Sequence, residues 1–112
     1  MDVRVSRLGS TPLVEAHGEI DHNNCGSVES ALGTALDEGH LVVLLDLRDV
    51  TYIDSGGLSV LLSGVRRLRD RGWLGVVGPN ANVKRLLEIV GLLVDPNFRV
   101  FADAGEAEGA LS

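Results

Sequence analysis

The sequence predicts a single α/β domain, residues 1–112, in which about four helices flank a mixed β-sheet. The apolar run Leu41–Leu45 does not alternate with polar residues, which is typical of a parallel strand buried on both faces. Apolar residues recur at helical spacing on both sides of this run, from Cys25 to Leu36 and from Leu58 to Leu68. Alternating strands and helices of this kind predict an α/β fold.

The N-terminal segment predicts an antiparallel hairpin, because two short alternating patterns at residues 3–5 and 13–16 are separated by Gly9-Ser10. The stretch from Gly18 to Asn24 is polar and rich in helix-capping residues, so we expect a connection there. A first helix then begins near Cys25, and Gly39 supplies its end.

Beyond the buried run, we expect a central helix that ends near Arg71-Gly72 and a strand over Trp73–Val77. An apolar stripe from Val83 to Val90 predicts the next helix. Phe98–Phe101 predicts a short edge strand, and residues 103–111 predict a terminal helix capped by its first residue. Right-handed crossovers place the later strands parallel to one another. The first strand lies antiparallel beside them because of the hairpin.

Composition excludes several classes of function. The net charge of −6 argues against binding to nucleic acid or to an anionic membrane, since both need a basic face. Cys25 is the only cysteine, so no internal disulfide can form, and the three histidines lack metal-ligand spacing. Neither a signal peptide nor a membrane-spanning segment is expected. We therefore expect a cytoplasmic protein without metal or cofactor.

The segment Tyr52–Leu58 stands where the buried strand gives way to the central helix. Asp54 and Ser55 are both candidate N-caps, because either side chain can accept a hydrogen bond from the first turn. The glycine pair that follows predicts a bare first turn that a partner could approach closely. Ser55 can thus be a simple cap or a functional hydroxyl, and the carboxyl end of a parallel strand is where such sheets bind ligands.

Five carboxylates are expected at this same end of the sheet, where they would form an acidic docking face for a basic partner. These residues are Glu19, Asp21, Asp46, Asp49 and Asp54. A solvated loop rim is the alternative interpretation.

The string Asp54-Ser55-Gly56-Gly57 also occurs in trypsin-like serine proteases, so hydrolysis has to be considered. A catalytic serine needs a histidine base held by a buried aspartate, and only His22 could come near. No phosphate-binding lysine loop or dinucleotide fingerprint is present. The serine therefore has the profile of an acceptor that another enzyme modifies.

Three segments together resemble the STAS domain family, and within it the bacterial anti-sigma factor antagonists. They are G-E-I-D at residues 18–21, I-D-S-G-G-L-S-V-L-L at residues 53–62, and G-P-N at residues 78–80 with the helix that follows. The position after the motif serine is often a small hydroxyl residue in this family and is Gly56 here.

The resemblance implies partner switching without catalysis. An unphosphorylated antagonist binds an anti-sigma factor, a serine kinase of the GHKL type, and so frees the sigma factor. The kinase phosphorylates the motif serine, here Ser55, and a serine phosphatase reverses the modification. The expected partner-binding residues are Asp21, His22, Asn23, Asp54, Gly56, Gly57 and Ser59. The alternative is a STAS subunit that does not switch, in a lipid-transport ABC complex or a stressosome-like scaffold.

Overall fold

A computed structural model describes residues 2–111, so the two terminal residues of the expected domain lie outside its range. One five-stranded sheet has the order β1-β2-β3-β4-β5. β1 (Asp2–Leu8) is antiparallel to β2 (Thr11–Ile20), and the remaining strands are parallel: β3 (Val42–Ile53), β4 (Trp73–Val77) and β5 (Phe98–Phe101). The expected mixed sheet is confirmed.

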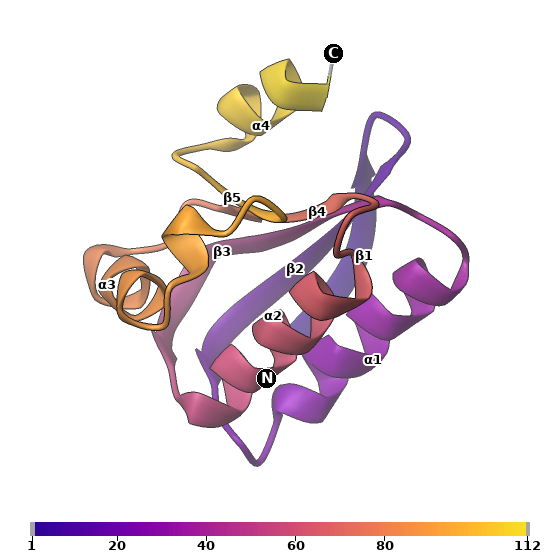
Figure 1. Cartoon of the computed structure of the whole chain (residues 1–112). Helices are drawn as coiled ribbons and strands as arrows, with labels where there is room; N and C mark the ends of the chain where they lie inside the picture. The colour runs from indigo at the N-terminus through magenta and orange to yellow at the C-terminus, as the bar shows by residue number, and fades with distance from the viewer. Residues whose placement is uncertain (1, 112) are drawn as a thin grey trace.

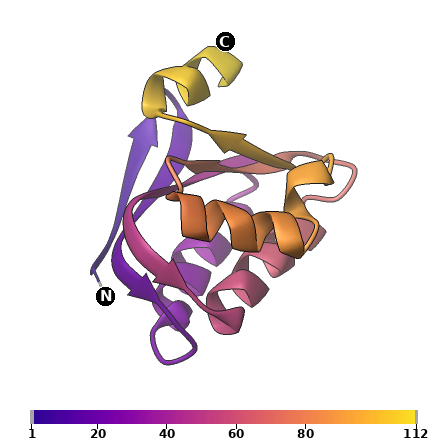
Figure 2. The same cartoon turned by 90° about the vertical axis from the view of Figure 1, so that its left-hand side faces the viewer.

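Helices cover the two faces of the sheet unequally (Figures 1 and 2). α1 (Cys25–Asp37), α2 (Ser55–Arg67) and α3 (Ala81–Ile89) lie on one face, together with the short 3-10 helix η1 (Leu92–Val94). α4 (Ala104–Leu111) lies on the other face. The larger core, between the sheet and the first three helices, is built almost entirely from Leu, Val, Ile and Ala side chains.

β3 is longer than the apolar run predicts. Asp46 is the last of its residues to pair with β4, and the segment from residue 47 to Ile53 pairs with β2 alone. Leu47, Val50 and Ile53 are buried at three-residue spacing, which two register shifts in the pairing with β2 accommodate. Because that spacing is not the two-residue period of a regular strand, the extension is not visible as a strand pattern.

β2 is longer as well, because it continues to Ile20 through residues that were expected to form a connection. α2 ends at Arg67, earlier than expected, and a turn follows in which Asp70 has a left-handed backbone with φ 63°. Asp103 caps α4 as expected, with its side chain accepting from the Glu106 amide at 2.8 Å. No helix within residues 2–111 is long and apolar enough to cross a membrane.

Candidate functional site

Two chain connections begin side by side at the end of the β2–β3 ribbon. Ile20 and Ile53 are partners in the parallel register, and the Asp54 amide donates to the Ile20 carbonyl at 3.0 Å. The β2–α1 turn and the first turn of α2 are therefore held against each other. This juxtaposition brings together Asp21, His22 and Asn23 from one turn with Asp54, Ser55 and Ser59 from the other.

Asp54 is the N-cap of α2, so of the two candidate caps the aspartate is the one used. Its Oδ1 accepts from the Gly56 amide at 2.8 Å and from the Gly57 amide at 3.3 Å. Its Oδ2 accepts from both the backbone amide of His22, at 3.1 Å, and the ring Nδ1, at 3.2 Å. Both carboxylate oxygens are thus engaged within the protein.

Partial burial raises the pKa of Asp54, but the hydrogen bonds from His22, Gly57 and Gly56 outweigh burial and leave that pKa below its usual value. The carboxylate is consequently ionised at neutral pH. An ionised side chain at this position also suits the partial positive charge of a helix N-terminus.

Asp21 organises the neighbouring turn. Its Oδ1 accepts from the amides of Asn23, at 2.9 Å, and Asn24, at 3.0 Å, while the Asn24 side chain accepts from the Asp21 amide at 2.9 Å. No other atom of residues 2–111 donates to its second oxygen, Oδ2. Asp21 therefore shapes the turn through one carboxylate oxygen.

Ser55 is exposed in the first turn of α2, and its hydroxyl makes no hydrogen bond to any of residues 2–111. Ser59 lies one helical turn further on and is exposed too. Residues four apart on a helix share a face, so the two hydroxyls lie on one accessible surface. An exposed, unbonded hydroxyl at a helix N-terminus is suited to accepting a phosphoryl group.

The glycine pair does not leave the first turn bare, which corrects that expectation. A Cβ at Gly56 would lie 2.6 Å from the Cα of His22, so the β2–α1 turn already occupies this space. A Cβ at Gly57 would lie 2.5 Å from Ile53 Cγ1 and 2.8 Å from Ile20 Cγ2, and Gly57 is buried. Both glycines allow the two turns to pack closely, and a partner could not reach Gly57.

The expected acidic face is only partly present, because the long β3 separates its members. Asp46 is 6% exposed and lies beside the end of β4, while residues 47–53 carry the chain roughly 23 Å further. Asp49 lies within that stretch and pairs with His17 Nδ1 at 3.0 Å. Asp21 and Asp54 lie at the site, and Glu19 is exposed beside it at the end of β2, whereas Asp46 is not part of a docking surface.

Asp46 is held by Arg48 instead. The guanidinium donates through Nη2 at 2.7 Å and through Nε at 3.0 Å, and the Arg48 amide adds a bond of 3.0 Å. Burial raises the pKa of Asp46, but these bonds outweigh it and hold that pKa below its usual range. This ion pair is a structural feature of the sheet.

Tyr52 is an exposed site residue that the motif analysis did not single out as a contact. It is 51% exposed at the end of β3, beside Glu19 in the register with β2. Exposed aromatic side chains are enriched in protein interfaces. The only tyrosine of the chain, two residues ahead of Asp54, was the available signal.

Catalytic machinery does not assemble around the serine. His22 directs Nδ1 to Asp54, but no histidine in residues 2–111 is hydrogen-bonded to the Ser55 hydroxyl. No group of three or more His, Cys, Asp or Glu side chains within that range could hold a metal ion. The geometry supports a docking and acceptor surface.

Comparison with known proteins agrees with this interpretation. A family model described as "Mlab, STAS domain" matches residues 3–94. The chain belongs to the STAS domain family. It is 26% identical over 105 residues to the anti-sigma-F factor antagonist RsfB of Mycobacterium tuberculosis, covering 94% of this chain and 84% of that protein. It is 37% identical over 76 residues to the anti-sigma-B factor antagonist of Listeria monocytogenes, covering 67% of each.

Solved structures show the same fold. An anti-sigma factor antagonist from Mycobacterium paratuberculosis matches with a TM-score of 0.85 and 24% identity over 97% of this chain and 92% of that one. SpoIIAA of Bacillus in its phosphorylated form matches with a TM-score of 0.78 and 18% identity over 99% of this chain and 100% of that one. The two sequence relatives of this STAS chain are regulatory binding proteins rather than enzymes, and their names support a role as an anti-sigma factor antagonist.

Proposed function

We propose that this STAS protein is an anti-sigma factor antagonist that is switched by phosphorylation of Ser55. The unphosphorylated form binds an anti-sigma factor, a serine kinase of the GHKL type, and so releases a sigma factor in the cytoplasm. The kinase phosphorylates Ser55, which ends the binding, and a serine phosphatase restores it. The observation that carries this proposal is the exposed, unbonded Ser55 hydroxyl beside the turn of Asp21.

Phosphorylation can act here without refolding the protein. A phosphate adds about −1.5 to −2 charges and three acceptor oxygens. Asp54 has both oxygens bound internally, so it can keep its role as the helix cap when the phosphate arrives. The backbone of His22 fills the space above Gly56, so the phosphate must extend outward, where a docked partner would lie.

The expected docking surface combines exposed residues from both turns with the half-buried Asp21. Asp21, His22 and Asn23 lie in the turn packed against the first turn of α2, Ser59 follows Ser55 by one helical turn, and Tyr52 would add an apolar contact. Asp54, Gly56 and Gly57 support this surface from within by fixing the two turns. A phosphate in the middle of such a surface would repel acidic partner groups and separate apolar ones.

Binding of purified variants to the cognate anti-sigma factor tests the proposal. Ser55→Ala should bind the kinase even with ATP present, while Ser55→Glu should bind at least tenfold more weakly, a change of about 1.4 kcal/mol. Ser63→Glu is the matched control, because Ser63 is an exposed serine two turns further along α2. Mass spectrometry after incubation with kinase and ATP should place a single phosphate on Ser55. Equal binding by all three variants would contradict the switch.

The description of the matching family model favours a second candidate, a STAS subunit that does not switch. In a lipid-transport ABC complex or a stressosome-like scaffold, Ser55 would stay unmodified. An affinity pull-down from lysate of the source organism separates the two. Recovery of membrane ATPase subunits by wild type and Ser55→Glu alike would favour the second candidate, and recovery of a kinase by wild type alone would favour the first.

A further inference from the structure

β1 forms a long, regular edge of the sheet (Figures 1 and 2). It pairs with β2 without interruption from Asp2 opposite His17 to Leu8 opposite Thr11, and it contains no proline. The other edge strand, β5, has only four residues. Within residues 2–111 no other strand pairs with the outer side of β1. Long, regular and open edges are templates for pairing with another strand.

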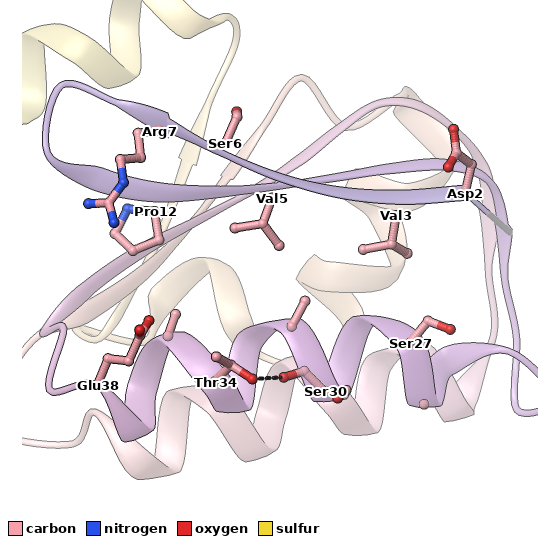
Figure 3. Close-up of a pocket in the computed structure, with 13 residues that line it drawn as sticks. Asp2, Val3, Val5, Ser6, Arg7, Pro12, Ser27, Ser30, Thr34 and Glu38 are labelled. Atoms are coloured by element: carbon pink, nitrogen blue, oxygen red, sulfur yellow. Dashed lines mark hydrogen bonds between the residues drawn. The ribbon is translucent and has the colours of Figure 1, made fainter.

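A groove of about 760 Å³ runs between β1 and α1 (Figure 3). Val3 and Val5 point from β1 into this space, and α1 faces them with small side chains such as Ser27 and Thr34. α1 therefore leaves the edge strand incompletely covered. Val5 is 63% exposed, although it belongs to the sheet face on which the larger core is built.

We propose that a second copy of this chain binds along β1. The two β1 strands would pair antiparallel about a twofold axis perpendicular to the sheet that passes beside Val5, joining the two sheets into one. In this arrangement Val5 lies opposite Val5 of the other copy, and the two grooves become one trough between the two α1 helices. Each Val5 then loses much of its contact with water, which favours association.

The length of β1 selects this register and its charges permit it, because an axis at Val5, the middle residue of Asp2–Leu8, pairs the whole strand. With Val5 at the axis, Val3 lies opposite Arg7 of the second copy and Arg4 lies opposite Ser6, so no like charges face each other directly. A shift that places Arg4 at the axis would put Arg4 opposite itself, which is unfavourable. Arg4 also has acidic neighbours in its own chain, since its Nε lies 4.0 Å from Asp2 Oδ2 and Glu15 is its register partner on β2.

The size of the contact predicts a modest affinity. A seven-residue strand is roughly 24 Å long, and the strand and helix layers together are roughly 20 Å deep. About 500 Å² per copy, or about 1,000 Å² in total, would be buried, which is near the lower limit for a specific interface. We therefore expect a dimer that dissociates at micromolar concentrations.

The Ser55 surface stays free in such a dimer. The pairing of β1 with β2 reaches only as far as His17, the partner of Asp2. Ser55 lies beyond the pair of Ile20 and Ile53, three residues further along β2. The antiparallel pairing places the two Ser55 surfaces at opposite ends of the joined sheet. Dimerisation is thus independent of the proposed switch, and either idea can fail alone.

Sedimentation of the full chain and disulfide trapping test the dimer. Wild type should form dimers as its concentration rises to about 100 µM, and Val5→Glu should raise the dissociation constant at least tenfold. Ile89→Glu is the matched control, because Ile89 is 68% exposed on α3, away from β1. It should sediment like wild type. Since Val5 is largely exposed, the thermal melt of Val5→Glu should match that of wild type at concentrations at which wild type is monomeric.

For trapping, Cys25 is replaced by Ser to remove the native thiol, and Val5→Cys is added. Directly opposite residues of paired strands are close enough for a disulfide, so this variant should cross-link under mild oxidation. Ile89→Cys in the same background should cross-link far more slowly. A wild type that stays monomeric, a dimer that Val5→Glu leaves intact, or equal cross-linking at the two positions would each overturn the proposal.

Discussion

Replacing Gly56 by Ala tests whether the close approach of the two turns holds the site together. The new Cβ would lie 2.6 Å from the Cα and 2.9 Å from the backbone N of His22, about 1 Å closer than carbon atoms pack. These are backbone atoms, so the whole β2–α1 turn must move. Overpacking of this kind lowers the free energy of unfolding by about 1–3 kcal/mol. Alanine restricts the unfolded chain more than glycine does, and this raises the free energy of unfolding by about 0.4–1 kcal/mol. The net expectation is a destabilisation of about 1–2 kcal/mol.

Gly26→Ala is the matched control, because Gly26 is the second residue of α1 as Gly56 is of α2, and a Cβ there meets nothing within 4 Å. The free energy of unfolding of this variant should be about 0.4–1 kcal/mol higher than that of wild type. Urea unfolding, followed by circular dichroism and by the fluorescence of Trp73, measures both changes as midpoint shifts at constant slope. If Gly56→Ala is as stable as Gly26→Ala, the β2–α1 turn moves without loss of stability, and the reasoning from close packing is wrong.

Two further changes test the carboxylates. Arg48→Ala should destabilise the protein by about 1–3 kcal/mol, because the buried Asp46 loses its charged donors. Arg48 is half-exposed, so screening by solvent limits the effect. Since the pKa of Asp46 is lowered in the folded state, its contribution is present above about pH 4 and is lost as the pH falls through the folded pKa. In Arg48→Ala the loss should begin at a higher pH, as urea midpoints between about pH 3 and 7 would show. In Asp54→Asn, the side-chain amide oxygen can still cap α2, but the NH₂ group cannot accept a hydrogen bond from the His22 amide. Hydrogen exchange at the His22 amide should therefore be faster than in wild type.

The sequence patterns predict the order and type of the elements because each carries its own periodicity. They miss the second half of β3, where Leu47, Val50 and Ile53 are buried at a spacing of three residues. That spacing arises from register shifts against β2, and such shifts depend on the pairing of residues far apart in the chain. The interpretation of Asp46 as a surface residue fails for the same reason.

At the site, the position of Ser55 follows from local pattern alone, since a strand, a capping residue and an amphipathic helix meet there. The role of Gly56 does not, because the atoms that require a glycine belong to His22, 34 positions earlier in the chain. In the sequence, a glycine pair after a helix cap is equally consistent with an open surface and with a close contact to another segment. Only the meeting of the two turns in space decides between them.

In the proposed switch, the saturated hydrogen bonding of Asp54 would let a charge on Ser55 change binding and leave the fold intact. A carboxylate with a free oxygen beside a phosphate would be pushed away and could release the helix cap. Here four donors hold Asp54, and two of them come from the other turn, so moving it would require separating the two turns. The side chain of Ser55, by contrast, is exposed and makes no hydrogen bond to residues 2–111. The first turn of α2 thus combines a fixed anion with an unbonded hydroxyl, and the proposed modification there would change the surface a partner meets without changing what supports it.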